Sequence, residues 1–166
     1  MKDTEAAFMW IINILRELAI PFQITGGLAA QLYGSKRPLA DIDIDILESD
    51  MEKLSARVHE HIVFGPAQYK DAAWDVKLMT LTYAGQDIDI SAFDTTKIFD
   101  VTTSAWVELG GNLHLSETFE VYGIQVPVIT KANLLAYKKM LGREVDRLDV
   151  AYLETPDGSS PATRER

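Results

Sequence analysis

The sequence contains no cysteine and only three histidines. The absence of cysteine excludes a disulfide, a zinc–thiolate site and a thiol nucleophile, and it favours a reducing, cytoplasmic location. His59 and His61 lie two positions apart on a predicted helix and therefore on different faces, so we interpret them as surface residues rather than metal ligands. His114 has no visible partner in the sequence.

Basic side chains are also few, since 16 lysines and arginines stand against 25 acids and give a net charge of −9. This balance disfavours a broad nucleic-acid-binding surface. The apolar run near the N-terminus lies between charges at Asp3, Glu5, Arg16 and Glu17 and is too short to cross a membrane. It also lacks the basic region and cleavage site of a signal peptide, so we expect no membrane association.

The chain has 166 residues, 47% of them hydrophobic, which is enough for one domain with a buried core. We predict a single domain over residues 1–154, with a core at about 1–100 and a C-terminal hairpin and helix at about 101–154. Residues 155–166 are of types common in turns and disordered segments, so we predict a disordered tail there.

Hydrophobic periodicity predicts an alternating order of helices and strands. The predicted fold class is α/β in the α+β arrangement, with a mixed, mainly antiparallel sheet flanked by helices and a C-terminal hairpin and helix. The stretch between the two predicted hairpins, which contains Trp106, is expected to be less regular. The predicted helices cover 4–19, 28–34, 49–62 with Ser49 or Asp50 as N-cap, and 131–153 with an interruption near Gly142; the predicted strands cover 21–25 and 41–47, and the hairpins cover 72–93 and 118–130.

Two of the predicted strands carry aspartates at alternate positions. Residues 41–47 read "DIDIDIL" and residues 87–90 read "DIDI". Because side chains alternate across a strand, the aspartates of each strand share one face and the isoleucines the other. Like charges on one face repel one another, so the pattern indicates either a solvated face or a bound cation.

Carboxylates from two neighbouring strands form a set of hard oxygen ligands, which suits Mg²⁺ or Mn²⁺. Magnesium in proteins usually keeps only a few carboxylate ligands and completes its coordination with water and substrate phosphates, so a nucleotide substrate is expected. Two such ions, roughly 3.5–4 Å apart, would assist the attacking oxygen and the leaving pyrophosphate.

A pair of glycines, Gly26 and Gly27, follows the predicted strand 21–25 and opens a short helix. Glycines allow the backbone to approach a phosphate, and helix N–H groups point toward it. Alone, such a pair is more often a plain turn. Followed by a short helix and an Asp-x-Asp strand, it predicts a phosphate site beside a metal site.

These motifs carry a family resemblance. The stretch "GGLAAQLYGSKRPLADIDIDI" resembles the motif of the DNA polymerase β-like nucleotidyltransferase superfamily: a Gly-Gly pair, a short helix, a basic residue and Asp-x-Asp. The later "AGQDIDI" is similar to that family's third-carboxylate strand, and "NLLAYKKMLGREVDRLDV" resembles the terminal helix of its small bacterial members. The resemblance covers residues 22–153, with the three motifs in the family order.

The resemblance implies a metal-dependent enzyme with three catalytic carboxylates. Asp41 and Asp43, preceded by Arg37 at the family spacing, would be the first two metal ligands. Asp89 would be the third ligand and the base toward the acceptor hydroxyl. The additional acids Asp45 and Asp87 leave this register open by two residues.

The nucleotide-binding residues are implied in the same way. Gly26, Gly27 and Arg37 would contact the nucleotide, and Lys138 would reach the triphosphate. The neighbouring Lys139 leaves the choice of lysine open, and from the sequence alone Lys138 is equally consistent with a solvated helix face. Some similar short proteins carry a "MazG-related" label, but the Glu-rich helical motif of MazG pyrophosphohydrolases is absent, so the label has no functional weight here.

The expected reaction is transfer of a nucleoside monophosphate from an NTP to an acceptor hydroxyl, with Mg²⁺ or Mn²⁺ as cofactor. The acidic composition ranks a small molecule or a protein above tRNA as the acceptor, which stays unidentified, as do the preferred NTP and the oligomeric state. The alternative is a catalytically inactive nucleotide-binding or partner-binding module on the same fold. A third interpretation is a divalent-cation site without nucleotide.

Overall fold

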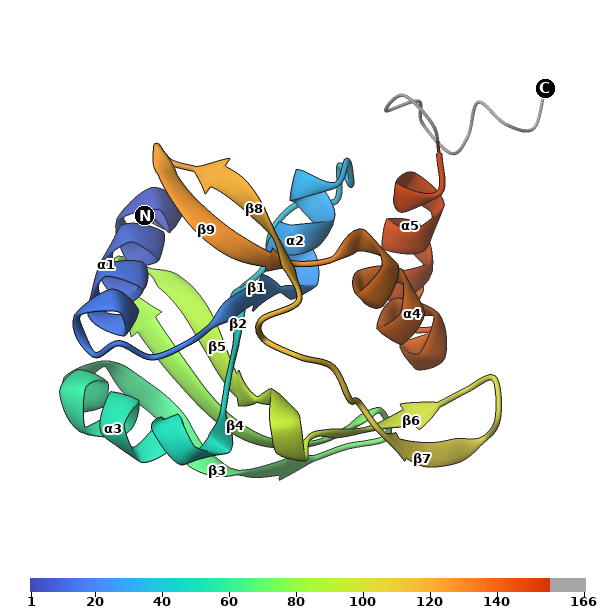
Figure 1. Ribbon diagram of the computed structural model, residues 1–166, viewed down its shortest axis with the longest axis horizontal. Helices are drawn as coiled ribbons and strands as arrows, with labels where there is room; N and C mark the ends of the chain where they lie inside the picture. Colours follow the sequence, from blue (N-terminus) through green and yellow to red (C-terminus); the bar gives the residue numbers. More distant parts are fainter. Residues whose placement is uncertain (156–166) are drawn as a thin grey trace.

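A mixed sheet of nine strands forms the centre of residues 1–155, the part of the chain that this computed structural model describes. The strand order is β7-β6-β4-β5-β2-β1-β9-β8, and β3 pairs with β4 (Figure 1). Most pairs are antiparallel, whereas β1 with β9 and β2 with β5 are parallel. The strands are β1 Gln23–Thr25, β2 Ile42–Ile46, β3 Ile62–Lys70, β4 Trp74–Tyr83, β5 Gln86–Ala92, β6 Lys97–Asp100, β7 Ala105–Glu108, β8 Ser116–Val121 and β9 Ile124–Ile129.

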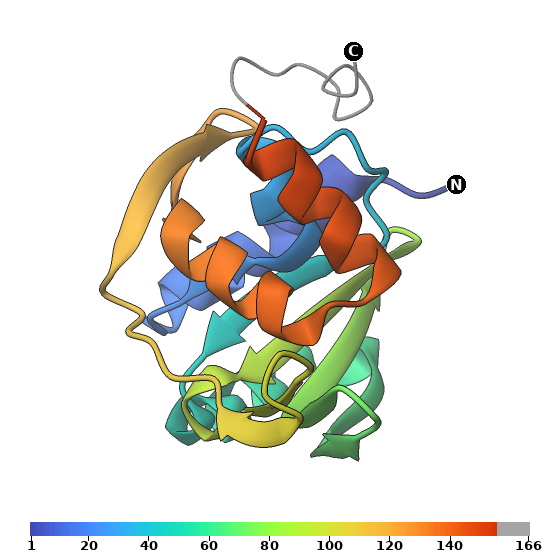
Figure 2. The same ribbon diagram turned by 90° about the vertical axis from the view of Figure 1, so that its right-hand side faces the viewer.

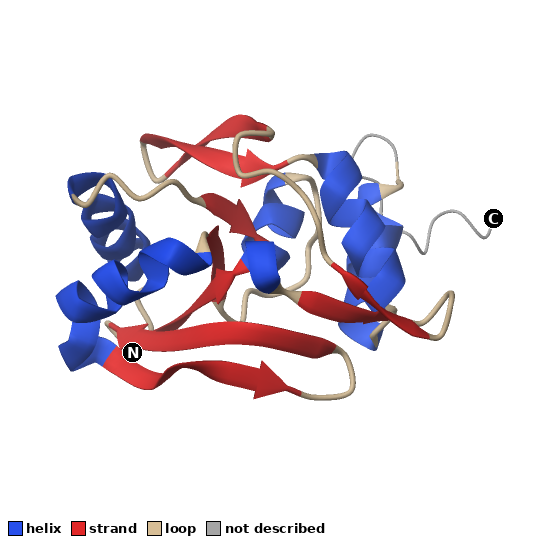
Figure 3. Cartoon of the chain, turned by 60° about the horizontal axis from the view of Figure 1, so that its bottom comes forward, coloured by secondary structure: helices blue, strands red, loops and turns tan. Residues whose placement is uncertain are grey.

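The helices lie in two groups on opposite sides of the sheet (Figures 1 and 3). α1 and α3 are on one side, and α2, α4 and α5 are on the other. None of the helices in residues 1–155 is long and apolar enough to cross a membrane. The helices are α1 Thr4–Glu17, α2 Gly26–Leu32, α3 Glu48–Val58, α4 Lys131–Leu141 and α5 Glu144–Leu153, with 3₁₀ turns at His59–His61 and Phe93–Thr95.

Aspartate and isoleucine alternate along β2 and β5, and in the structure they give each strand one apolar and one acidic face, as the sequence predicts. Ile42, Ile44 and Ile46 are fully buried in the core, which α1 and α3 cover. The aspartates point to the other side of the sheet, toward α4 and α5. The predicted fold class, a mixed and mainly antiparallel sheet flanked by helices, is confirmed.

Three strands were not predicted. β3 carries a mixture of exposed and half-buried residues rather than a clear alternation, because it lies at the sheet margin and pairs only with β4, with register shifts along the way. The stretch expected to be irregular contains β6 and β7, which pair with each other and continue the sheet past β4. Both are only four residues long, too short for periodicity to reveal.

The predicted N-cap of the third helix was wrong. α3 begins at Glu48 with Leu47 in the N-cap position, so neither Ser49 nor Asp50 caps it. The capping acceptor comes from elsewhere in the chain, since Asp94 Oδ1 accepts the Glu48 backbone N–H at 2.9 Å. The helix also ends at Val58, four residues earlier than predicted, where a 3₁₀ turn leads into β3.

The C-terminal helix is divided, as the position of Gly142 suggested. Gly142 takes a left-handed conformation (φ 58°) and ends α4, and α5 starts two residues later. Thr155, the first residue of the predicted tail, is buried, and its hydroxyl donates to the Ala151 carbonyl at 2.6 Å. The rest of the predicted tail, 156–166, lies outside the described residues.

Substitution of the distant cap of α3 should have a measurable effect on stability. Asp94→Ala removes the acceptor of the Glu48 N–H and should lower the free energy of unfolding by about 1 kcal/mol. Asp94→Asn retains a side-chain oxygen and should stay close to wild type. Urea denaturation measures both variants; an equal loss in both would contradict the capping role.

Candidate active site

A cavity of about 630 Å³ opens on the acidic face of the sheet. Its lining combines residues of β1, β2 and β5 with residues of α4 and of the start of α5. In Figure 2, α4 and α5 pass in front of the central strands, and in Figure 1 they lie to one side of them. The cavity brings together all seven residues that the sequence analysis assigned to the site: Gly26, Gly27, Arg37, Asp41, Asp43, Asp89 and Lys138.

Parallel pairing of β2 with β5 places two of the aspartates side by side. Asp43 and Asp89 are direct cross-strand partners, and Thr25 faces Asp43 from β1. Asp89 is oriented by β4, where the Thr80 hydroxyl donates to its Oδ1 at 2.6 Å. Asp41 directly precedes β2 and also lines the cavity.

The charges of these carboxylates affect one another. Burial, together with the charges of Asp89 and Asp41, raises the pKa of Asp43 to about 7. Burial raises the pKa of Asp89 as well; the Thr80 hydrogen bond opposes the shift and the charge of Asp41 adds to it. Burial and the charge of Asp87 raise the pKa of Asp41.

This donor set fits a divalent cation. Its side chains offer only hard oxygen atoms, and a cation would relieve the repulsion that raises the pKa values of Asp41, Asp43 and Asp89. In residues 1–155 no three His, Cys, Asp or Glu side chains converge as a ready-made metal site. Mutual repulsion and the Thr80 hydrogen bond to Asp89 are both consistent with carboxylates that do not converge by themselves.

Gly26 lies directly against Asp43, whereas the side-chain position of Gly27 faces Arg37 and Leu39. A Cβ atom on Gly26 would be 2.1 Å from Asp43 Oδ2, and Gly26 has φ 61°. The Gly26 N–H donates to the Tyr137 hydroxyl at 3.0 Å, and the Gly27 N–H donates to the Asp43 carboxylate and lowers its pKa. In this structure both amides therefore interact with side chains, and Gly26, which has no side chain, leaves room for Asp43.

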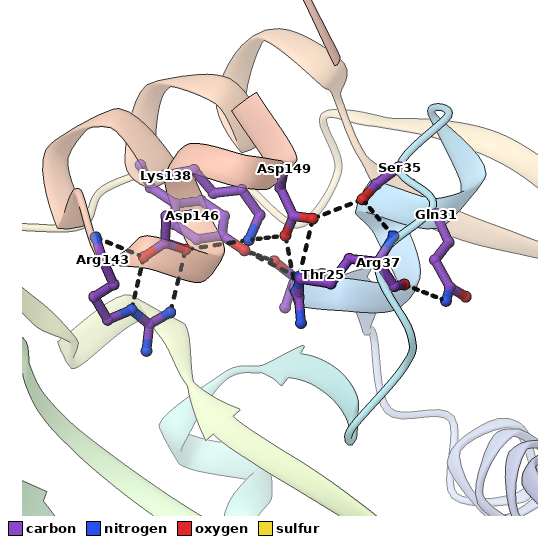
Figure 4. Close-up of polar contacts among 10 residues, drawn as sticks. Thr25, Gln31, Ser35, Arg37, Lys138, Arg143, Asp146 and Asp149 are labelled. Carbon is purple, nitrogen blue, oxygen red and sulfur yellow. Dashed lines mark hydrogen bonds and ion pairs between the residues drawn. The ribbon is translucent and has the colours of Figure 1, made fainter. Parts of the chain in front are cut away.

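Arg37 is held at the cavity by a buried carboxylate (Figure 4). Its Nε and Nη2 donate to the two oxygens of Asp149, at 3.0 and 2.8 Å, and the Ser35 hydroxyl donates to Asp149 at 2.7 Å. Although burial opposes it, hydrogen bonds from Arg37, Ser35 and Lys138 lower the pKa of Asp149. This pairing connects α5 to the loop between α2 and β2.

Lys138 is buried and doubly paired. Only 3% of the residue is exposed, and its Nζ lies 2.9 Å from Asp149 and 3.2 Å from Asp146, both fully buried (Figure 4). The lysine is also close enough to lower the pKa of Asp43. The alternative interpretation of Lys138 as part of a solvated helix face is therefore wrong. Its ammonium group forms ion pairs with two carboxylates of α5.

Arg143, which lines the cavity, belongs to the same network of ion pairs. It pairs with Asp146 three residues later, with Nε 2.6 Å from the carboxylate. Its guanidinium lies over the ring of Trp74, 5.8 Å from the centroid. Tyr137 is buried and hydrogen-bonded to Thr25.

The acids of α5 were the functional neighbours that sequence reasoning missed. Asp146 and Asp149 lie in the predicted helix 131–153, and both are fully buried only because the helix divides at Gly142. The signal that was available is their spacing: Asp146 and Asp149 lie on one helix face. His61 was also assigned to the surface, yet its ring packs edge-on against Trp10, with centroids 4.8 Å apart.

Paired aspartates on parallel strands, a glycine turn against them and an adjoining cavity are the arrangement of nucleotidyltransferases, which move a nucleoside monophosphate from an NTP to an acceptor hydroxyl. The family model for Aminoglycoside-2''-adenylyltransferase matches residues 7–153, and the chain belongs to this family. No curated protein sequence matches it significantly. The comparisons support the nucleotidyltransferase resemblance and give no support to the MazG-related label.

Solved structures share the fold. The Thermotoga maritima protein TM1012, described as a nucleotidyltransferase, has a TM-score of 0.63 at 21% identity, over 89% of this chain and 90% of that one. The lincosamide antibiotic adenylyltransferase LnuA, with lincomycin bound, has a TM-score of 0.60 at 16% identity, over 93% and 99%. The antibiotic-resistance factor ANT(2'')-Ia has a TM-score of 0.55 at 16% identity, over 98% and 91%.

Because Gly26 contacts Asp43, adding one methyl group at Gly26 should strongly weaken ATP binding. Gly26→Ala would displace Asp43 and should weaken Mg²⁺-dependent ATP binding at least tenfold, measured by titration calorimetry. Gly34→Ala is the matched control, because Gly34 also has a positive φ (114°) but has nothing within 4 Å of its would-be Cβ. Comparable loss of ATP binding in both variants would contradict a specific role for the Asp43 contact.

The pairing of Asp149 predicts a pH-dependent contribution to stability. Because the folded pKa is lowered, the contribution is present above the unfolded pKa, near 4, and is lost as pH falls through the folded pKa. Asp149→Asn leaves Arg37 without its carboxylate and Lys138 with Asp146 alone, and it should cost about 3 kcal/mol at pH 7.

Urea denaturation at several pH values between 7 and 3 measures this effect. The difference between wild type and Asp149→Asn should shrink as the pH falls below the unfolded pKa, near 4, toward the lowered folded pKa, because the unfolded chain takes up the proton first. Ser35→Ala, which removes one hydroxyl donor to the same carboxylate, is the control and should lose less at pH 7. A difference that stays constant down to pH 3 would argue against the ion pair as its source.

Proposed function

We propose that this protein is an adenylyltransferase that uses ATP and Mg²⁺ to modify a hydroxyl group of a small molecule. The observation that carries the proposal is the cross-strand pairing of Asp43 with Asp89 at the cavity, with Gly26 packed against Asp43. The family membership supports adenylyl transfer, and the names of LnuA and ANT(2'')-Ia connect the fold to antibiotics in those proteins.

The acceptor proposal follows from the cavity. A volume of about 630 Å³ is typical of pockets for small ligands. Its walls include apolar and aromatic side chains such as Trp74, Phe93 and Leu109 beside the polar groups, which suits a compact molecule more than an extended polymer. The net charge of −9 also disfavours a nucleic-acid acceptor.

Asp41, Asp43 and Asp89 would hold the divalent ion, which when bound would neutralise phosphate charge and stabilise the pyrophosphate leaving group. The side chain of Asp89 would act on the acceptor. One carboxylate oxygen of Asp89 is fixed by Thr80, and the raised pKa of Asp89 suits a group that takes up a proton.

The reaction balances at the α-phosphorus. The acceptor oxygen forms a bond to it, the bond from the α-phosphorus to the bridging oxygen breaks, and pyrophosphate leaves with that electron pair. The hydroxyl proton passes to Asp89. In-line transfer of this kind depends mainly on positioning and charge stabilisation.

The triphosphate would be bound by the guanidinium groups at the cavity. Arg37 and Arg143 each give two donors to an α5 aspartate, which leaves N–H groups for phosphate oxygens. Lys138 was expected to reach the triphosphate directly. Its pairing with Asp146 and Asp149 favours instead an indirect contribution, in which Lys138 fixes the two aspartates that orient Arg37 and Arg143.

The first test is a binding titration of non-hydrolysable ATP, GTP, CTP and UTP, with and without Mg²⁺. The wild type should bind ATP best and only with the metal, and the Asp41→Asn/Asp43→Asn double variant should lose that binding. No Mg²⁺-dependent binding of any NTP by the wild type would refute the proposed function.

The second test separates the role of Asp89 as base from its role as metal ligand. Asp89→Asn should reduce transfer at least a thousandfold, followed as pyrophosphate release, because the amide cannot accept the proton. ATP affinity should change less than threefold, because the amide keeps one oxygen for the metal, and Asp41 and Asp43 are unchanged. Thr80→Val keeps the carboxylate and should cost much less. An equal loss of ATP binding and transfer in Asp89→Asn would refute its role as the base.

A further inference from the structure

Gln86 is a fully buried amide at the start of β5 to which the reaction described above gives no role. Its Oε1 accepts a hydrogen bond from the Thr4 hydroxyl at 2.7 Å, and its Nε2 donates to the carbonyls of Ala40 at 3.0 Å and Asp87 at 2.9 Å. Burying an amide is unfavourable unless it is hydrogen-bonded, whereas a fully bonded amide fixes the groups around it. Gln86 therefore holds α1, β5 and the residue before Asp41 in one arrangement.

Asp41 is the proposed metal ligand that receives the least support from the sheet. Asp43 and Asp89 are cross-strand partners within the parallel pair of β2 and β5. That pairing begins at Ile42, so Asp41 directly precedes the first paired residue of β2. The position of Asp41 therefore depends on how the chain approaches the strand.

The side chain of Gln86 extends the connection between β2 and β5 beyond the paired residues. Ile42 faces Ile88, and continuing this register by two residues would bring Ala40 opposite Gln86. At this point the Gln86 side chain, rather than a backbone N–H, binds the Ala40 carbonyl. Asp41 is thus connected to β5 on both sides, through Ala40 before it and Ile42 after it.

Thr4 sets the orientation of the Gln86 amide. The carbonyl oxygens of Ala40 and Asp87 both lie within hydrogen-bond distance of one end of the amide, and only its NH₂ group can donate to both. The Thr4 hydroxyl donates to the amide oxygen and so stabilises this orientation. Thr4 is the first residue of α1, which covers the face of the sheet opposite the cavity (Figure 1).

Lys2 binds the same stretch of backbone from the surface. Its Nζ donates to the carbonyls of Leu39 at 2.8 Å and Ala40 at 3.2 Å, the last two carbonyls before Asp41. This stretch of backbone determines where the Asp41 carboxylate lies. Because Mg²⁺ requires near-ideal octahedral coordination, displacement of one ligand lowers the affinity of the whole site.

We propose that Gln86 is a positioning residue of the active site, which fixes Asp41 relative to Asp43 and Asp89 and thereby sets the affinity of the site for its divalent ion. This inference rests on the proposed function, in which Asp41 is a metal ligand. Gln86 contacts neither ATP nor the acceptor and acts only through the backbone at Ala40. Thr4 contributes through the orientation of the Gln86 amide.

The experiment compares the wild type with four variants. Gln86→Leu nearly keeps the volume of the side chain and removes its hydrogen bonds. Thr4→Val removes the hydroxyl that orients the amide, whereas Thr4→Ser keeps it. Val58→Ala truncates a buried side chain of α3, on the side of the sheet opposite the cavity, and is the control for a loss of stability alone.

Two binding measurements and one stability measurement are made on each variant. Calorimetry with non-hydrolysable ATP gives the Mg²⁺ concentration at which ATP binding is half-maximal. Electron paramagnetic resonance gives the Kd of Mn²⁺ without nucleotide. Urea denaturation shows that the variant folds and how much stability it has lost.

Gln86→Leu should raise the half-maximal Mg²⁺ concentration and the Kd of Mn²⁺ about tenfold, because the site tolerates little displacement of a ligand. Thr4→Val should raise both about threefold, the effect of one lost hydrogen bond. Thr4→Ser should match wild type. Val58→Ala should lose stability but bind Mg²⁺, Mn²⁺ and ATP as the wild type does.

A double variant tests whether Gln86 acts through Asp41. Asp41→Asn alone should weaken metal binding, because it removes a carboxylate ligand. Adding Gln86→Leu to Asp41→Asn should then have little further effect, because the ligand that Gln86 positions is already absent.

Three outcomes would overturn the inference while leaving the proposed function intact. In the first, Gln86→Leu folds and binds both ions as the wild type does. In the second, Val58→Ala weakens metal binding as much as Gln86→Leu, so that the loss follows stability. In the third, Gln86→Leu has its full effect on top of Asp41→Asn.

The Thr4 variants decide the matter if Gln86→Leu does not fold. Equal metal affinities of Thr4→Val and Thr4→Ser would then overturn the inference. Failure of the wild type to bind any NTP with Mg²⁺ would overturn the proposed function and this inference together.

Discussion

The parallel pairing of β2 with β5 is the constraint on which the rest of the site depends. It places Asp43 beside Asp89, an arrangement that is unfavourable without a cation because burial and mutual repulsion raise both pKa values. The neighbouring structure accommodates this: Gly26 has no side chain to displace Asp43, and Thr80 orients Asp89. The apolar faces of the same strands supply the core, so the acidic edge is held by the most deeply buried part of the molecule.

A second pair of acidic residues, on α5, lies next to the aspartates of the sheet. Asp146 and Asp149 on α5 bind Lys138, Arg37 and Arg143, so the cationic side of the cavity is positioned by buried carboxylates rather than by solvent. Removing one member of such a group leaves another buried charge unpaired, which is why ion pairs of this kind position side chains strictly even when they add little net stability. The site thus has two acidic layers with different tasks, one facing the substrate and one facing the arginines.

The sequence predicted the parts of the fold that depend on local pattern. The alternation of aspartate and isoleucine located β2 and β5, and Gly142 located the division of the C-terminal helix. What it could not show depends on contacts between distant segments. The cap of α3 comes from Asp94, the burial of Asp149 depends on Arg37, and the edge strand β3 lacks a clear alternation. For the site, the seven residues singled out all line one cavity, but the sequence contained no sign that Lys138 is neutralised by two aspartates.

The left-handed turn at Gly142 also bears on the order in which the chain acquires its structure. In a continuous helix Lys138 and Asp146 would lie about 12 Å apart along the axis, whereas the reversal brings them to 3.2 Å. Arg37 pairs with a residue 112 positions later. The arginine side of the cavity can therefore be completed only after α5, which follows every strand of the described chain, has been synthesised.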